Sequence, residues 1–353
     1  MSENKDKIET LKALIISDDN PSSFKEYLEQ MLVNNDMDAL MMKFLKASQM
    51  DVESAYKKFL WLFKFRQVHH VDIILRHVLN NESYDNVRKN LSQGPHAYDI
   101  DGYPCYWVRF GQLNIPTLLT TTSITEVLFQ LIQGMEYVNR VLFERQSNAT
   151  HHTINKITLV VDLSGLSFSM FFGESRQCLS ALTRAALSYF PELLHKMIIF
   201  NTGIAFSVGW SFAQLFIDPD TRDKIVILKN SNIQEFSKYI SIEKIPKEYG
   251  GQCSCPNGCI SDKDHLHAYE TEEMKQYFYK SRDQYTKENG EEKWAYPVSK
   301  NTSDACSVVN SHDNQWKTID LTQNKHSCEV LHKPIPQVSK PILDLIPEIQ
   351  SIW

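Results

Sequence analysis

The sequence is poor in glycine and lacks the glycine-rich patterns of nucleotide and hydrolase sites. Its 353 residues include 12 glycines, and none precedes Gly94. No G-x-G-x-x-G, P-loop or G-x-S-x-G pattern occurs, so the usual signals of dinucleotide binding, phosphate binding and a nucleophilic serine are absent. No other nucleophile and base form a recognisable set. We therefore expect a protein that is not an enzyme and needs no cofactor.

An excess of positive charge is also lacking. The net charge is −6, which gives a nucleic-acid partner no overall electrostatic support. The first residues, MSENKDKIET, are charged and contain no apolar signal core. We therefore expect a cytoplasmic protein that does not bind nucleic acid, with its seven cysteines mostly reduced.

One long segment has no charge at all. Residues 197–217, MIIFNTGIAFSVGWSFAQLFI, carry no charged side chain. A run of this length can span a bilayer, but Asn201-Thr202-Gly203 forms a turn cluster within it. We predict a buried strand at Met197–Phe200, a turn, and an apolar helix that ends at Asp218-Pro219. A helix that is apolar on all sides needs apolar surroundings, which means a deep core or a hydrophobic ligand.

Three regions follow from the distribution of apolar residues. Residues 1–92 read as a helical lobe, with an amphipathic helix at Val52–Val68. Residues 93–253 alternate strands and helices, which predicts an α/β domain with a mostly parallel sheet. Residues 254–353 are a polar, irregular extension of uncertain fold. The elements predicted in the middle region are strands at 105–110, 157–162, 197–200 and 225–228 and helices at 123–144, within 174–190 and at 231–241.

A cluster of cysteine and histidine begins where the middle region ends. Its members are Cys253, Cys255, Cys259, His265 and His267. Thiolate and imidazole ligands this close in sequence can hold zinc tetrahedrally. However, C-x-C-x3-C is not a standard zinc knuckle, and Pro256-Asn257-Gly258 already accounts for a tight turn. We interpret the segment as a metal-free loop and keep zinc as the alternative.

Six segments, in order along residues 40–251, are similar to the motifs of one family. The run from Lys43 to Ala47, with Met50-Asp51-Val52 after it, resembles R-F-L-R-A-R-x-F-D-V. YDIDGYPCYW resembles Y-D-x-D-G-x-P-V, and ITLVVDLSGLS resembles I-x-D-x-x-G-L-S. YFPELLHKMIIFNTGIAFSVGW, DPDTRDKIVIL and IPKEYGG resemble three further motifs. By these residues the chain is identified as a member of the CRAL-TRIO lipid-binding proteins, in their phosphatidylinositol-transfer-like branch.

The resemblance implies a fold and a function. A helical lobe would precede a mixed, mostly parallel sheet that floors a lipid pocket, and the helix Phe206–Phe216 would be a mobile gate over it. The pocket and gate residues would be Tyr106, Phe200, Phe206, Trp210, Phe212 and Phe216. The protein would bind phosphatidylinositol or another phospholipid as its ligand and would visit membrane surfaces transiently to exchange it.

Two charged residues carry over from the phosphoinositide-binding members. The Glu after their Y-P motif and the Lys of D-P-x-T-x-x-K help to hold the inositol phosphate, and the matching residues here are Glu192 and Lys224. The plainer readings are that Pro191-Glu192 forms a first helical turn and that Lys224 flanks a strand. The family's basic pair falls on Ser48 and Gln49, so a positive charge expected at the phosphate is missing.

Two other functions remain open from the sequence. Because that positive charge is missing, the pocket could carry a neutral hydrophobe such as tocopherol, squalene or a retinoid. Alternatively, the C-terminal extension could recruit partners, which would make the protein a scaffold or signalling adaptor.

Overall fold

The computed structural model describes most of the first 261 residues. The described residues are 2–17, 28–68, 71, 81–122, 124–173, 175–176, 178–179, 189–204, 206, 210, 219–228, 232–261, 308–309 and 318–319. The predictions for Phe212, Phe216, His265 and His267 lie outside them. Within these ranges, no helix is both long and apolar enough to cross a bilayer.

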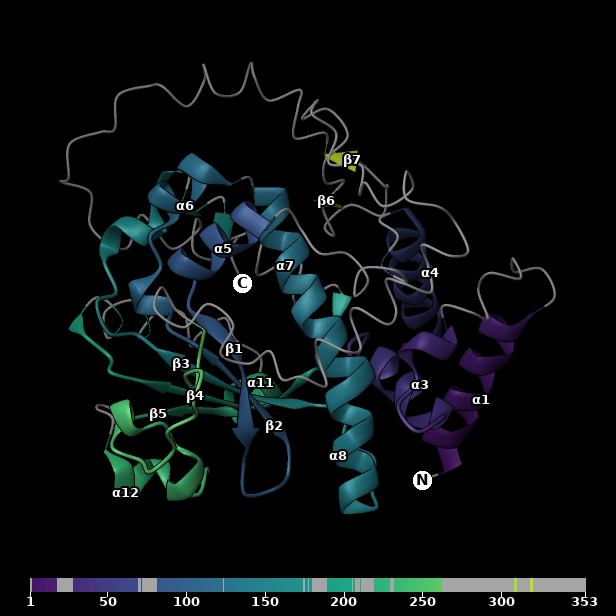
Figure 1. The fold of residues 1–353 in the computed structure, drawn as a ribbon. Coiled ribbons are helices and arrows are strands. Elements are labelled where there is room, and N and C mark those ends of the chain that lie inside the picture. The colour runs from purple at the N-terminus through teal and green to yellow at the C-terminus, as the bar shows by residue number, and fades with distance from the viewer. Residues whose placement is uncertain are drawn as a thin grey trace, which may run out of the picture.

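The N-terminal helices pack as a bundle beside the sheet (Figure 1). They are α1 (Ser2–Ile16), α3 (Met37–Lys46) and α4 (Val52–Val68), and α5 (Asn81–Asn90) leads into the sheet. Helix α3 begins after Asp36, whose Oδ1 accepts a hydrogen bond from the backbone of Ala39 at 2.9 Å, a favourable N-cap. Leu11, Phe44 and Phe59 are fully buried between the helices. The predicted helical character of this region is confirmed.

A five-stranded sheet follows, in the order β1-β2-β3-β4-β5. Its strands are β1 (Gln93–Tyr98), β2 (Pro104–Val108), β3 (Ile157–Asp162), β4 (Leu194–Phe200) and β5 (Ile225–Ile227). The pair β1–β2 is antiparallel and the other three pairs are parallel. The predicted α/β class with a mixed, mostly parallel sheet is confirmed, and so are the strands at β3, β4 and β5. Two further short strands pair with each other, β6 (Val308–Val309) and β7 (Thr318–Ile319).

The helix predicted at 123–144 is confirmed and extends further. It runs as α7 (Ile124–Tyr137), a π-helical turn (η3, Val138–Leu142) and α8 (Phe143–Thr150). The remaining α-helices are α6 (Ile115–Thr121), α11 (Pro219–Arg222) and α12 (Ile233–Phe236), with 3-10 turns at Phe110–Gln112, Phe168–Phe171, Ile242–Lys244 and Lys247–Tyr249.

The helix predicted at 231–241 is wrong in its length. Helix α12 is capped by Asn232, whose side chain accepts from the backbone of Gln234, and it ends at Phe236. The chain then turns so that the carbonyl of Tyr239 accepts a hydrogen bond from the backbone of Ile100 at 2.9 Å. This tertiary bond to the turn before β2 outweighs continuation of the helix.

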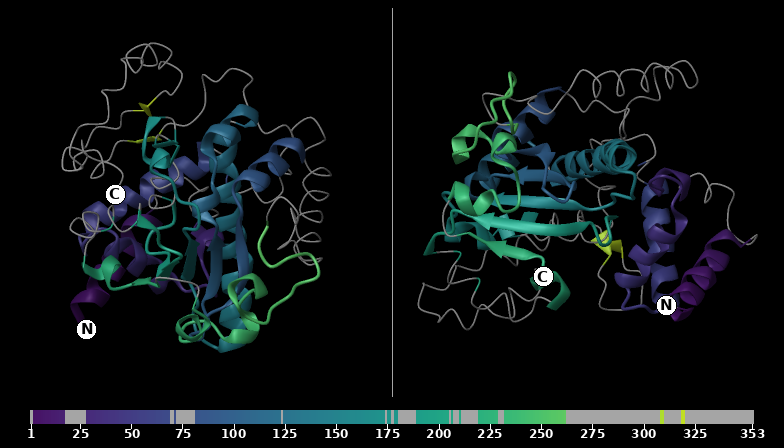
Figure 2. Two further views of the ribbon diagram at one scale, coloured as in Figure 1. Left: turned by 90° about the vertical axis from the view of Figure 1, so that its left-hand side faces the viewer. Right: turned by 90° about the horizontal axis from the view of Figure 1, so that it is seen from below.

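The two faces of the sheet are packed to different degrees. On one side, which we call the packed face, a single cluster spans β2 to β5 and is completed by residues 233–260; it contains Trp107, Val160, Ile198, Phe200, Phe236 and Tyr249. On the other side, which we call the open face, α7 and α8 cover Tyr106 and Leu159. Figure 2 gives two further views of the sheet, with the green segment that contains α12 beside its strands.

A buried carboxylate joins the helical lobe to α7. Arg66 of α4 donates to both oxygens of Glu136, at 2.7 and 3.0 Å, and Arg140 donates from Nε to the same carboxylate at 2.7 Å. Glu136 is 1% exposed and Arg66 is 3% exposed. Burial acts to raise the pKa of Glu136, but the two arginine charges outweigh it and hold that pKa below its usual value.

Replacing this carboxylate should loosen the junction between the lobes. Glu136→Gln leaves two arginines without a counter-charge, and breaking a buried pair costs about 3–5 kcal/mol of unfolding free energy. The matched control is Glu53→Gln, which removes an exposed i,i+4 pair with Lys57 and should cost less than about 1 kcal/mol. Urea unfolding of both variants measures the difference. Equal, small losses would show that the pair does not hold the lobes together.

Candidate functional site

The two charged residues carried over from the family motifs lie together at one edge of the sheet. Strands β3, β4 and β5 are parallel, so their amino ends share an edge. Glu192 lies just before β4 and Lys224 just before β5. Lys224 Nζ is 3.4 Å from Glu192 Oε2, and their side chains are 24% and 25% exposed. An ion pair this accessible can exchange its partner for a ligand.

Glu192 lies in a turn rather than in a helix. Its backbone φ is +52°, in the left-handed region that a non-glycine residue rarely adopts. The turn over Pro191 and Glu192 leads directly into β4. The reading of Pro191-Glu192 as a first helical turn is therefore wrong, and the turn directs the carboxylate toward Lys224.

Three more lysines act electrostatically on Glu192. Burial and the charge of Lys156 lower the pKa of Lys43 to about 7, although Glu192 opposes this shift. Burial lowers the pKa of Lys58 in the same way, and burial followed by the charges of Lys224 and Lys46 lowers that of Lys156. With Lys224, four lysines thus interact electrostatically with one carboxylate. We call these five residues the lysine cluster: Lys43, Lys58, Lys156, Lys224 and Glu192.

Ser48 and Gln49, where the family has a basic pair, lie near two lysines of the helical lobe, Lys43 and Lys58. Ser48 and Gln49 lie in the tight turn between α3 and α4, where Gln49 has a φ of +52°. Lys43 donates to the carbonyl of Asn155, and Lys58 donates to the carbonyl of Ala47 at 2.7 Å. The sequence did not indicate this cluster because its five members come from five separate segments.

A narrow cleft lies beside the lysine cluster, between α3, α4 and the amino edge of the sheet. Lys43, Asn155 and Pro191 are among the residues that line it. Its cavity volume is about 40 Å³, whereas small-molecule pockets usually measure about 300–1,000 Å³. The cleft has space for only a few water molecules in this conformation, so it does not by itself accommodate a lipid.

Apolar side chains on the open face remain partly accessible over β4 and β5. Met197 pairs with Ile225 across the two strands, both are half-buried, and Ile227 is 36% exposed. Among the described residues, the cluster beneath α7 and α8 includes no side chain of β4 or β5. Parallel sheets are normally covered on both faces, so this part of the sheet offers apolar surface to a further layer.

The aromatic residues assigned to the pocket lie in different places. Tyr106 is buried under α7. Its hydroxyl lies 3.4 Å from where a Cβ at Gly134 would stand. Phe206 stacks on Trp210 with 5.5 Å between ring centroids.

The assignment of Phe200 to the same pocket as Tyr106 is wrong. Tyr106 is in register with Leu159 and Met197 on the open face. Phe200 is three residues beyond Met197, and side chains alternate between faces along a strand. Its ring is fully buried on the packed face, at 4.8 Å from Phe236 and 5.0 Å from Tyr249.

Several motif residues have structural roles at the carboxyl ends of the strands. Asp162 Oδ1 accepts from the backbone of Ser164 at 2.9 Å and from Asn201 Nδ2 at 3.0 Å. Its Oδ2 accepts from the Tyr249 hydroxyl at 3.1 Å, and Arg109 donates to that hydroxyl at 3.3 Å. One carboxylate therefore ties together the ends of β3 and β4 and the Y-G-G turn.

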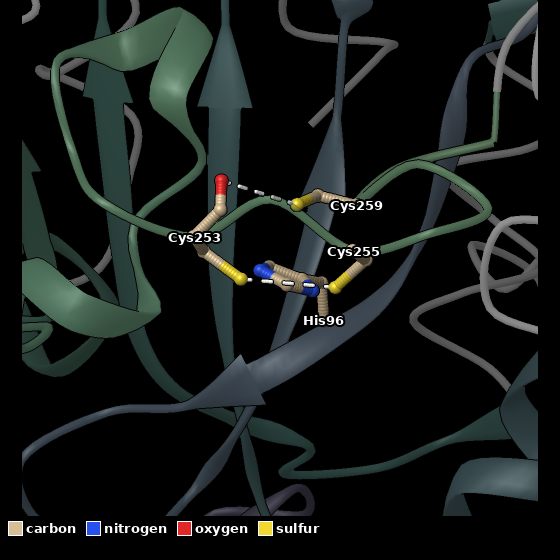
Figure 3. A group of neighbouring side chains, drawn as sticks. All are labelled: His96, Cys253, Cys255 and Cys259. Carbon is tan, nitrogen blue, oxygen red and sulfur yellow. Dashed lines mark hydrogen bonds between the residues drawn. The ribbon is translucent and has the colours of Figure 1, made fainter.

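The loop that carries Cys253, Cys255 and Cys259, which we call the cysteine loop, lies on the packed face. His96, a residue that the sequence did not indicate, lies beside it. The thiols of Cys253, Cys255 and Cys259 and the imidazole of His96 place their ligand atoms within 4.8 Å of one another (Figure 3). His96 belongs to β1, a strand that was not predicted because QGPHAY contains glycine and proline and shows no alternation. The spacing of the cysteines alone could not indicate this fourth group.

Comparison with known proteins agrees with this geometry. The family model described as the CRAL/TRIO domain matches residues 88–251. The phosphatidylinositol/phosphatidylcholine transfer protein SFH14 of Arabidopsis thaliana is 30% identical over 224 residues, which are 63% of this chain and 39% of that protein. A CRAL-TRIO domain-containing protein of Saccharomyces cerevisiae is 27% identical over 219 residues, 61% of this chain and 70% of that protein.

A solved structure shares the fold. The crystal structure of Sfh5 superposes with a TM-score of 0.55 at 19% identity, and the match covers 80% of this chain and 98% of that one. The matching segment spans about two fifths of the length of the plant relative. The motifs, the sheet order and these matches lead to one conclusion: residues 88–251 are similar in sequence to the CRAL/TRIO domain and share its mixed α/β fold.

Proposed function

We propose that this protein binds a phospholipid, with phosphatidylinositol as the favoured head group, and transfers it between membranes without catalysing a reaction. The observation that carries the proposal is the lysine cluster at the amino edge of the parallel strands, directly beside the partly accessible apolar surface of β4 and β5. The surface is charged at one end and apolar along its length. A phospholipid is built in the same way, with a charged head group and apolar acyl chains.

The charges of the cluster suit a phosphate bonded to a polyol. Four lysines against one glutamate leave an excess of positive charge around Glu192. Lys224 can donate a charge-assisted hydrogen bond to a phosphate oxygen, while the Glu192 carboxylate can accept from ring hydroxyls. A choline head group offers no hydroxyl to Glu192, so this arrangement favours inositol.

The open face suits acyl chains. Met197, Ile225 and Ile227 run along β4 and β5 away from the lysine cluster. Each methylene buried against such a surface contributes about 0.8 kcal/mol. The apolar segment after Phe200, with the Phe206–Trp210 stack at its start, would cover the chains as a gate that inserts into the membrane during exchange.

The relatives support the class of function. SFH14 and two further Arabidopsis thaliana relatives are phosphatidylinositol/phosphatidylcholine transfer proteins by name. The matched segments cover only the part of those proteins that this chain shares, so the activity is proposed here from the site. A neutral hydrophobe would use the same apolar surface but would leave the lysine cluster without a partner.

Removing the lysine at the centre of the cluster should weaken head-group binding selectively. A lost hydrogen bond to a charged group costs about 1.5–3 kcal/mol, so Lys224→Ala should bind phosphatidylinositol about 10- to 100-fold less tightly. Tocopherol binding should be unchanged. The control is Lys238→Ala, the same charge change at an exposed site next to α12. If both variants bind phosphatidylinositol with equal affinity, the result would favour a neutral hydrophobe as the ligand.

A charge on the open face should abolish lipid binding whatever the head group. Ile227 is accessible and lies on the edge strand β5, so Ile227→Asp should leave the fold intact. It should reduce the affinity for phosphatidylinositol and for tocopherol at least about tenfold, because a buried isoleucine side chain contributes about 1.5–3 kcal/mol. Ile100→Asp, at an exposed isoleucine next to Asp101, is the control. Normal vesicle-to-vesicle transfer by Ile227→Asp would show that acyl chains do not lie on β5.

The depressed pKa of Lys43 predicts a pH dependence. Lys43 is charged below about pH 7 and neutral above it. An anionic head group binds the charged form more tightly, so phosphatidylinositol affinity should rise as pH falls from 8 to 6. Lys43→Met keeps the apolar stem and should flatten the profile. A profile that is steep in both proteins would show that another group titrates on binding.

A further inference from the structure

We propose that the cysteine loop and β1 form a structural zinc site, with Cys253, Cys255, Cys259 and His96 as its four ligands. The three cysteines come from one short loop, and the histidine comes from a strand far away in sequence (Figure 3). From sequence, a metal-free loop is the preferred interpretation because C-x-C-x3-C is not a standard zinc knuckle and the Pro256-Asn257-Gly258 segment already accounts for a tight turn. His96 supplies a fourth ligand from within the described residues.

The sulfur positions fit a metal better than a disulfide. Cys253 Sγ and Cys255 Sγ are 3.7 Å apart. Two thiolates bound to one tetrahedral zinc, each about 2.3 Å from the metal, stand roughly 3.8 Å apart. A disulfide requires about 2.05 Å between the sulfurs. The third thiol is close to these two: Cys259 Sγ is 3.8 Å from the carbonyl oxygen of Cys253.

The imidazole of His96 is oriented as a ligand usually is. Its Nε2 lies 3.1 Å from the carbonyl oxygen of Lys244, which can only accept a hydrogen bond, so Nε2 carries the proton. Nδ1 therefore has the lone pair that a metal needs. Histidine ligands almost always donate their second N–H to a carbonyl or carboxylate, which fixes the ring and its tautomer.

The backbone on both sides holds the ligands in place. The carbonyl of His96 accepts from Trp107 Nε1 at 3.0 Å. The β1–β2 register shifts between Pro95 and Tyr98, and a bulge of this kind redirects a side chain. In the loop, Cys253 N donates to the carbonyl of Ile245 at 2.9 Å, and a turn closed by Gly258 N and the carbonyl of Cys255 brings Cys259 back.

The ligand set identifies the metal and its role. Thiolate and imidazole ligands select zinc over the hard cations magnesium and calcium. Four protein ligands leave no open position, which is typical of a structural rather than a catalytic site. Binding displaces the protons of the three thiols. The metal would fasten residues 253–259 to β1 next to Ile260, which is 1% exposed in the packed core.

Metal analysis of the full chain tests the site. Protein purified without chelator should contain one zinc per chain by elemental analysis. His96→Ala and Cys255→Ser should each lower the affinity for zinc, which competition with a chromophoric chelator measures. The loss should exceed the roughly 10- to 100-fold that removal of a supporting hydrogen bond costs. The matched control is Cys178→Ala, at a buried cysteine outside the loop, which should keep the wild-type affinity.

A second measurement needs no variant that could fail to fold. Wild-type protein stripped of metal and loaded with Co²⁺ should show the intense visible absorption of a tetrahedral site with thiolate ligands. Weak octahedral absorption, or the absence of zinc after incubation with Zn²⁺ alone, would overturn the proposal. Unchanged zinc affinity in a folded His96→Ala variant would overturn it too, because the fourth ligand would then lie elsewhere.

Discussion

The carboxylate of Glu136, buried between Arg66 and Arg140, is the contact on which the candidate site depends. Transfer of a carboxylate into a protein interior is costly unless charged donors satisfy it, and here both oxygens are bonded. The contact joins α4 of the helical lobe to α7 over the sheet. Lys43 and Lys58 belong to that lobe, whereas Lys156 and Lys224 belong to the edge of the sheet. The lysine cluster therefore exists only while the two lobes are docked.

The parts of the fold that the sequence predicted correctly are those with a strong local signal. Strand β3 is an apolar run bounded by polar residues, and α4 has a clear helical stripe, so both were placed at their observed bounds. Strand β1 was missed because its formation depends on pairing with β2 rather than on its own residues. Phe200 was placed on the wrong face for a related reason. Strand β4 is apolar at every position from Met197 to Phe200, as buried parallel strands are, so its alternation carries no information about which side meets a ligand.

The residues of the candidate site also divide into those that the sequence signals and those that it does not. Glu192 and Lys224 were found because each belongs to a motif, and the structure brings them to 3.4 Å. Lys58 and Lys156 were not singled out, because single lysines on separate segments have no pattern, and Lys43 was noted only as the start of the first motif. His96 was missed since it approaches the cysteines only through the sheet. Other motif residues, such as Asp162 and Tyr249, hold strand ends together. Similarity in a motif thus reflects strand geometry at some positions and, under the proposed function, ligand contact at others.

The unequal packing of the two faces would make the proposed lipid exchange physically compatible with a stable fold. Regions that open during function come from the less stable parts of a structure, and the accessible apolar residues of β4 and β5 lie on the open face. The packed face carries the continuous cluster, in which the Trp107 ring stacks on Phe236 and on Tyr249 at centroid distances of 6.1 and 5.6 Å. A metal at Cys253 and His96 would add a constraint to that side alone. Under the proposed function, the sheet would keep its register while lipid entered and left on the other side, because the lipid would not replace the clustered contacts of the packed face.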